Sequence, residues 1–429
     1  MRTSHLPGSR RTHRTLARVA ALVVGLTGAG CDGILDIELP GRIPSGQLND
    51  PSLAAVLVRS VVGDFECAYN NYFAGSAVHS DEYETANSNV PLANWGERSI
   101  TSDEDDYAIG GCEATSAGGS NFGMHVPMHT ARFQAEDVFN RLEGWTDEQV
   151  ADRASLKATV RAYAGYTYTF LGETYCAVAF DGGPESPPED ALARAEERFT
   201  EAISLAQGAG NTDMLNLARV GLARVKLDLQ KWSEAEAAAA QVPAGYEKLA
   251  DRGDESDRRW NKVFYIAQQV GAYVVAPALR NLNDPRVLVA PVIQANGDTA
   301  PAFNPDIHLW VTTKYPDLSA PIRLASYREA QLIRAEALAE QGQIGPALAI
   351  LNTRRQEVGL ADVSAATQAE AISRVIEERR RELSFEGGHR LNDLLRRNIA
   401  WKVGANQFTA RPYGTTTCWP FPTKERNGA

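Results

Sequence analysis

The sequence lacks most of the patterns that mark enzymes and nucleic-acid-binding proteins. It contains no nucleophile elbow, metal motif or isolated carboxylate pair, and its five cysteines include no CxxC spacing that would hold zinc or a redox dithiol. Acidic residues outnumber basic residues, 54 to 43, and the formal net charge of −11 argues against a nucleic acid partner. We therefore expect no catalytic residue, no metal and no cofactor.

Long apolar runs are also missing: none after residue 30 approaches the ~20 residues that a spanning helix needs. Residues 1–30 are typical of a signal peptide, because five arginines and no acids accompany a short apolar run from Val19 to Leu26. Ala29 and Gly30 precede Cys31 as in a lipobox, so we expect cleavage there, acylation of Cys31 and a lipid anchor. The alternative is an ordinary signal peptide with an incidental cysteine. Cleavage removes the five arginines and changes the formal net charge from −11 to −16.

An even number of cysteines remains once Cys31 is assigned to lipid. In an oxidising compartment this number favours two disulfides with three possible connectivities, and buried free thiols are the alternative. The candidates are Cys67, Cys112, Cys176 and Cys418.

The body of the chain, residues 51–429, is predicted to be one mainly α-helical domain that follows an extended tether at 31–50. Apolar residues recur every three or four positions in many segments, and alanines such as Ala218 and Ala239 permit close helix packing, as in tetratricopeptide-like hairpins. These hairpins are expected at about 130–242 and 321–387. The predicted helices are 51–72, 133–142, 155–175, 191–206, 214–229, 232–242, 321–341, 346–358 and 367–387.

Two segments, about 83–120 and 243–320, lack helical periodicity and are predicted to be loop-rich insertions that carry the binding function. Within the second, the β-branched stretches 287–293 and 308–313 predict a small hairpin. The acidic run 103–106 lacks the alternating ligands of a calcium loop. Pro127 lies between His125 and His129 and argues against a helical metal pair, so these histidines are expected to be structural.

Three stretches near the C-terminus form a specific signature: YREAQLIRAEAL from Tyr327, EERRRELSFEG from Glu377 and RLNDLLRR from Arg390. In order, spacing and residue type they resemble the SusD/RagB family, lipoproteins that capture nutrients over an outer-membrane TonB-dependent transporter. The turns 80–82 and 283–287 resemble further family features. The resemblance implies an α/α superhelix of tetratricopeptide-like units with a few short strands. It also implies a SusC-like TonB-dependent barrel as partner and a lipid-anchored place on the outer membrane, exposed at the cell surface.

The signature carboxylates Glu382, Glu386 and Asp393 also suggest an acid and base pair of the glycosidase kind. Neighbouring arginines would keep these groups ionised, which argues against catalysis.

Binding has a clearer physical basis, because the apolar face of a sugar ring stacks on an aromatic side chain. The candidate ligand-binding residues are Trp95, Tyr107, Trp260, Trp310 and Tyr315. Trp95 and Trp310 are favoured because each adjoins polar residues in a segment expected to be exposed. Core packing is the alternative for every one of them.

The sequence thus predicts a non-catalytic lipoprotein that binds a glycan or another nutrient oligomer and covers a SusC-like barrel as a lid. The alternative function is a tetratricopeptide-like periplasmic scaffold that binds protein partners. Asp32 directly after Cys31 leaves open which membrane leaflet holds the anchor.

Overall fold

The computed structural model describes residues 45–87, 89–104, 112 and 123–426. The predicted signal peptide, Cys31 and Tyr107 lie outside these ranges. The chain divides into two units, Met1–Asn49 and Asp50–Ala429. Of the first unit the structure describes only a short helix, η1 (Ser45–Gln47), and its last residues. Among the described residues, no helix has both the length and the apolar character needed to cross a membrane.

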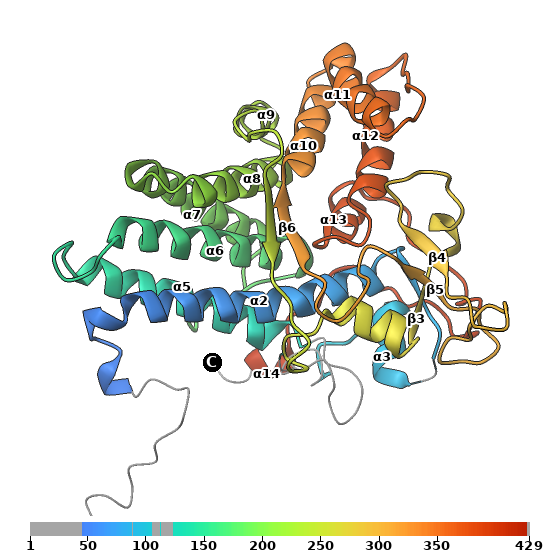
Figure 1. Ribbon diagram of the computed structural model, residues 1–429, viewed down its shortest axis with the longest axis horizontal. Helices are drawn as coiled ribbons and strands as arrows, with labels where there is room; N and C mark the ends of the chain where they lie inside the picture. The colour runs from blue at the N-terminus through green and yellow to red at the C-terminus, as the bar shows by residue number, and fades with distance from the viewer. Residues whose placement is uncertain (1–44, 88, 105–111, 113–122, 427–429) are drawn as a thin grey trace, which may run out of the picture. The chain divides into compact units, whose positions relative to one another are not determined.

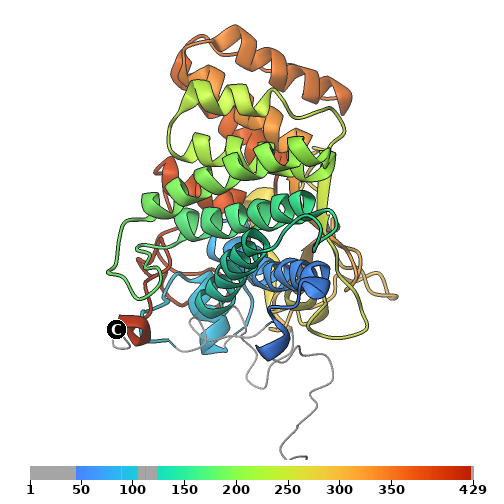
Figure 2. The same ribbon diagram turned by 90° about the vertical axis from the view of Figure 1, so that its left-hand side faces the viewer.

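The second unit begins with helices that stack on one another in chain order (Figures 1 and 2). A short helix, η2 (Pro51–Leu53), leads into the long α2 (Ala54–His79), and α5 to α9 then build the stack upward. The bounds are α5 (His125–Gly144), α6 (Arg153–Thr174), α7 (Pro188–Ala209), α8 (Thr212–Asp228) and α9 (Trp232–Ala239). This arrangement confirms the predicted tetratricopeptide-like hairpins.

A second group of helices continues the stack with α10 (Tyr327–Glu340), α11 (Ile344–Glu357) and α12 (Gln368–Glu382). The last of the group, α13 (His389–Arg396), returns to contact α2 and α6. The predicted helix 321–341 was wrong at its start, because Ile322–Ser326 forms strand β6 and pairs with β2 (Glu247–Ala250). The Ser326 side chain accepts a hydrogen bond from the Glu329 backbone N–H at 3.1 Å and so begins α10 at the next residue.

The rest of the unit is irregular, with a short helix α3 (Val90–Gly96) and two further two-stranded sheets. Strand β1 (Tyr83–Thr85) pairs with β3 (Tyr273–Val275), where the sequence predicted only loop. The predicted hairpin is confirmed: β4 (Val289–Pro291) is antiparallel to β5 (Trp310–Thr312). Helices η3 (Phe264–Gln269), η4 (Pro277–Leu279) and α14 (Thr423–Arg426) complete the order.

Helix α5 begins at His125, so Pro127 does not keep its two neighbours out of a helix. Proline is tolerated in the first turn, where the backbone N–H has no partner within the helix, and the sequence argument overlooked this position. His125 and His129 therefore lie one turn apart, with ring centroids 4.3 Å apart.

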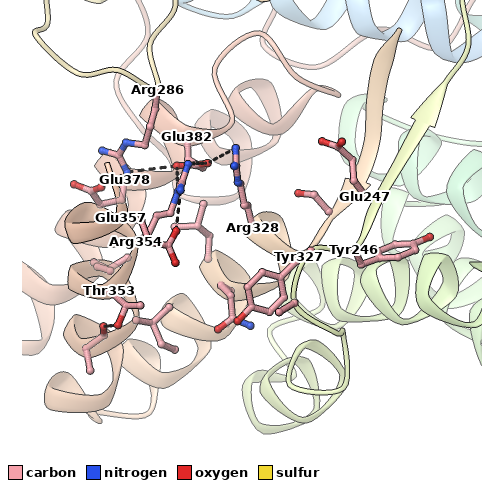
Figure 3. Close-up of a pocket in the computed structure, with 18 residues that line it drawn as sticks. Tyr246, Glu247, Arg286, Tyr327, Arg328, Thr353, Arg354, Glu357, Glu378 and Glu382 are labelled. Carbon is pink, nitrogen blue, oxygen red and sulfur yellow. Dashed lines mark hydrogen bonds and ion pairs between the residues drawn. The ribbon is translucent and has the colours of Figure 1, made fainter. Parts of the chain in front are cut away.

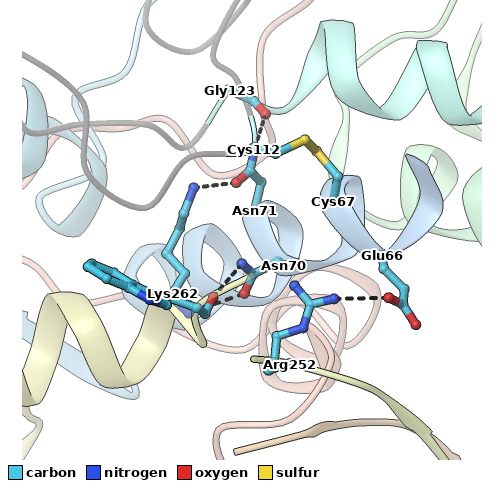
Figure 4. Close-up of a disulfide and its surroundings, with 9 residues drawn as sticks. Glu66, Cys67, Asn70, Asn71, Cys112, Gly123, Arg252 and Lys262 are labelled. Atoms are coloured by element: carbon cyan, nitrogen blue, oxygen red, sulfur yellow. Dashed lines mark hydrogen bonds and ion pairs between the residues drawn. A yellow bond between two sulfur atoms is a disulfide. The ribbon is translucent and has the colours of Figure 1, made fainter. Parts of the chain in front are cut away.

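Two disulfides join segments that are distant in sequence. Cys67 on α2 is bonded to Cys112, and Cys176, just after α6, is bonded to Cys418 near the C-terminus. Figure 4 shows the first disulfide beside polar residues of α2, where Asn71 Nδ2 donates to the Gly123 carbonyl at 2.8 Å. The four cysteines are thus joined in one of the three connectivities that the sequence left open.

Candidate binding site

Two adjoining cavities lie where the β2–β6 ribbon meets the last helical hairpins. Their volumes are about 530 Å³ and about 510 Å³. We call the first, which is lined by α10 and α11, the hairpin cavity, and the second, which is lined by Leu249 and Arg323 of the ribbon, the ribbon cavity. Five residues line both: Glu247, Arg286, Arg328, Arg354 and Glu382. Because they share these residues, the two cavities are direct neighbours.

The hairpin cavity has an apolar floor and a charged end. Leu332 of α10 and Ile350 and Leu351 of α11 supply the floor. Figure 3 shows Tyr246 and Tyr327 on the side away from Arg286, Glu378 and Glu382, with Glu247 beside Tyr246. A cavity of this amphipathic kind, with few charged groups at one end, suits a ligand that has both an apolar face and polar substituents.

Glu382 is the centre of the charged end (Figure 3). Its two carboxylate oxygens accept hydrogen bonds from Nε and Nη2 of Arg354, both at 2.9 Å. Nη1 of Arg328 lies 3.4 Å from the carboxylate of Glu382, and Nη1 of Arg286 lies 3.6 Å from it. One buried carboxylate thus faces three guanidinium groups.

The turn before β4 fixes the third of these arginines. Arg286 donates from Nε and Nη2 to the Asp284 carboxylate at 2.9 and 2.7 Å, and from Nη1 to Glu378 of α12 at 2.6 Å. Burial opposes ionisation of Asp284, but the hydrogen bonds from Arg286 outweigh it and lower the pKa to about 2. The Asp-Pro-Arg turn therefore attaches the irregular region to α12 through ionised groups.

The other signature carboxylates are also paired. Glu386 accepts from Lys314 Nζ at 2.8 Å and from Arg323, and these cations lower its pKa although burial acts in the opposite direction. Burial is likewise outweighed at Asp393, whose pKa Arg379 and Arg396 lower. Carboxylates held ionised in this way are poor general acids. Among the described residues, no three His, Cys, Asp or Glu side chains converge as metal ligands.

Two of the predicted aromatic residues are buried. The expectation that Trp95 lies in an exposed segment is wrong: its side chain is 1% exposed and packs edge-on against Trp419, at 5.5 Å between ring centroids. Tyr315 is buried as well, and its hydroxyl donates to the Phe385 carbonyl at 2.8 Å, although it borders the ribbon cavity. The short helix α3 turns Trp95 inward, a fold that its polar neighbours in sequence did not reveal.

The other two described candidates are half-buried and separate. Trp310 lies on β5 with the Arg280 guanidinium 5.2 Å from its ring centroid, and that guanidinium also lies 6.0 Å from the Phe408 ring. Trp260 donates from Nε1 to the Asp254 carbonyl at 3.2 Å and neighbours Tyr265. Neither tryptophan lines the hairpin or ribbon cavity.

Sequence reasoning missed the cavity residues Tyr246, Thr353 and Arg354. Tyr246 directly precedes β2, and Thr353 and Arg354 lie on α11, so the two segments are more than a hundred positions apart and meet only through the fold. The one available signal was the arginine-rich end of α11, which faces the glutamates of α12.

Comparisons with known proteins agree with this architecture. The model of the SusD family matches residues 320–423, which contain β6, α10 to α13 and most of the charged end. Residues 320–423 thus match the SusD family, as the sequence signature predicted. No curated protein sequence matches it significantly.

Solved SusD-like structures share the fold along most of the chain at low sequence identity. A SusD homolog from Bacteroides thetaiotaomicron has a TM-score of 0.68 at 15% identity, covering 90% of this chain and 97% of that one. A SusD superfamily protein from Bacteroides vulgatus has a TM-score of 0.66 at 17% identity, covering 87% and 96%. A laminarin-binding SusD-like protein has a TM-score of 0.65 at 15% identity, covering 88% and 97%.

Proposed function

We propose that this protein is a non-catalytic lipoprotein that binds nutrient oligosaccharides and delivers them to a SusC-like TonB-dependent barrel, which it covers as a lid. The observation that carries the proposal is the family signature at 320–423 on a SusD-like fold. Two solved relatives of that fold are described as carbohydrate-binding and laminarin-binding, which supports a glycan as ligand. Acylation of Cys31 would anchor the protein to the outer membrane at the cell surface.

Trp310 remains the best of the aromatic candidates for stacking on a sugar. It is half-buried on β5, and the exposed apolar side chains Ile293 and Phe303 belong to the same insertion. Arg280 holds the ring by a cation–π contact and could also donate hydrogen bonds to sugar hydroxyls. Trp260 is the second candidate for stacking on a sugar. Trp95 and Tyr315 are buried and are therefore no longer candidates for this role.

Gentle solubilisation of the native envelope followed by affinity purification tests the partner. We expect a TonB-dependent barrel to co-purify in stoichiometric amount, and we expect Cys31→Ala to move the protein into the soluble fraction. Co-purification of soluble periplasmic proteins without a barrel would favour the scaffold function instead.

Ligand binding is tested separately by titration calorimetry with laminarin and other neutral glucans. Trp310→Ala should weaken binding by roughly ten-fold or more, as loss of a stacking platform typically does. Phe133→Ala removes an exposed ring on α5 and serves as the matched control. Equal affinity of the two variants would remove Trp310 from the site.

A further inference from the structure

The ion-pair network that extends from the charged end of the hairpin cavity into α11 and α12 contains one more arginine than carboxylates. Starting at Glu382, a connected set of side-chain ion pairs joins six arginines with five carboxylates among the described residues. The arginines are Arg286, Arg328, Arg354, Arg355, Arg380 and Arg381, and the acids are Asp284, Glu357, Glu377, Glu378 and Glu382. The network therefore carries a surplus of one positive charge.

Arg328 is where that surplus is available to a ligand. Its side chain is 48% exposed, the most of the six, and its ion pair with Glu382 is 3.4 Å long. Glu382 already accepts two hydrogen bonds of 2.9 Å from Arg354, so it does not fully neutralise the charge of Arg328 as well. Arg328 lines both cavities and can therefore reach a ligand in either of them.

The surroundings of Arg328 favour a ring-shaped ligand with hydroxyl groups. The apolar floor of Leu332 and Ile350 and the neighbouring Tyr327 suit the C–H face of a sugar. Thr353 and the largely exposed carboxylate of Glu357 offer hydrogen-bond acceptors for hydroxyls on the same wall. A carboxylate on the ring would accept a charge-assisted bond from Arg328.

From this arrangement we propose that the hairpin and ribbon cavities bind an acidic oligosaccharide, with a uronate carboxylate held by Arg328. The inference rests on the proposed function in so far as the ligand is a saccharide, but it assigns a site distinct from Trp310. An acidic peptide would use the same arginine, but it offers fewer hydroxyl donors to Glu357 and Thr353.

The test compares a galacturonate tetramer with its methyl ester, which keeps the rings and removes the charge. We expect the acid to bind the wild-type protein at least about ten-fold more tightly than the ester. Arg328→Gln should abolish this preference, while Arg334→Gln should keep it. Arg334 lies on the same helix, is paired with Glu236 at 2.8 Å and lines neither cavity.

Each outcome has a defined meaning, provided that thermal unfolding shows both variants to be folded. Equal affinity for acid and ester, or an unchanged preference in Arg328→Gln, overturns the proposal. Binding of a glutamate-rich peptide through Arg328 without binding of the galacturonate tetramer overturns the saccharide class. If the protein binds laminarin and co-purifies with the barrel but does not bind the galacturonate tetramer, only this inference fails. If it also fails to bind laminarin and no barrel co-purifies, the proposed function fails.

Discussion

Arg390 of α13 holds Asp81, which follows α2, by two hydrogen bonds of 2.6 Å, one from Nε and one from Nη2. Burial opposes ionisation of Asp81, but these bonds outweigh it and lower its pKa. The neighbouring Glu82 accepts from the backbone N–H of Phe385, also at 2.6 Å. The C-terminal signature is thus attached to a turn that lies 309 positions earlier in the chain.

Arg390→Ala is expected to lower the free energy of unfolding by about 2 to 3 kcal/mol, because it leaves a mostly buried carboxylate without its partner. Chemical denaturation measures this change. Arg426→Ala removes a similar bidentate pair with Glu185 at the surface and should cost much less, because water screens exposed charges. Similar losses in the two variants would show that burial does not set the value of the Asp81 pair.

Replacement of Cys176 and Cys418 by serine should lower the free energy of unfolding by about 5 kcal/mol in the chain-entropy model, because the disulfide closes a loop of 242 residues. The disulfide of Cys67 and Cys112 closes a loop of only 45 residues, so its replacement by serines should cost about 4 kcal/mol. Mass mapping without reductant should find no free thiol among the four. Alkylation of all four in the native protein would contradict both disulfides.

Gly221→Ala should destabilise the protein by about 1 to 3 kcal/mol, since a Cβ there would lie 2.2 Å from the Phe199 ring, where α8 packs on α7. Gly63→Ala on α2 meets no atom within 4 Å and should instead stabilise the protein by about 0.5 to 1 kcal/mol. Thermal unfolding of both variants checks these opposite signs. A stabilising Gly221→Ala would disprove the close helix contact.

Acid should weaken the protein through His125. Burial lowers the pKa of its imidazole from 6.5 to about 4, and neither ring nitrogen makes a hydrogen bond. The unfolded chain therefore binds the proton more readily, and stability that is present above pH 6.5 is lost as the pH falls toward 4. Relative to His125→Phe, the wild type should lose up to about 3 kcal/mol over this range.

Urea denaturation at several pH values measures the difference between these two proteins, so that titrating groups common to both largely cancel. Glu82 and Glu329, whose pKa values burial raises to about 7, are among those groups. A difference that does not change with pH would show that folding does not lower the pKa of His125.

The sequence predicted the parts of the fold that depend on local pattern. Amphipathic period and small residues placed most of the helices within a few residues of their bounds, and β-branched runs located β4 and β5. It failed where distant partners decide the structure. Ile322–Ser326 is a strand because β2 pairs with it, and Trp95 is buried because Trp419 covers it.

The same limit applies to the candidate site. The sequence identified the Asp-Pro-Arg turn and the arginine-rich signature, but not that Arg286, Arg354 and Glu382 meet beside a cavity. The surplus charge at Arg328 follows only from counting ion pairs in three dimensions.

Trp419 has a consequence for how the chain folds as it is made. The indole is fully buried and packs on Tyr72, Trp95 and Tyr175, with ring centroids 5.5 to 5.9 Å apart. These rings emerge from the ribosome long before their cover does, by roughly half a minute at about 10 residues per second. Until Trp419 is in place, the rings of Tyr72, Trp95 and Tyr175 lack their cover, so a chain that stops short of Trp419 cannot complete this core.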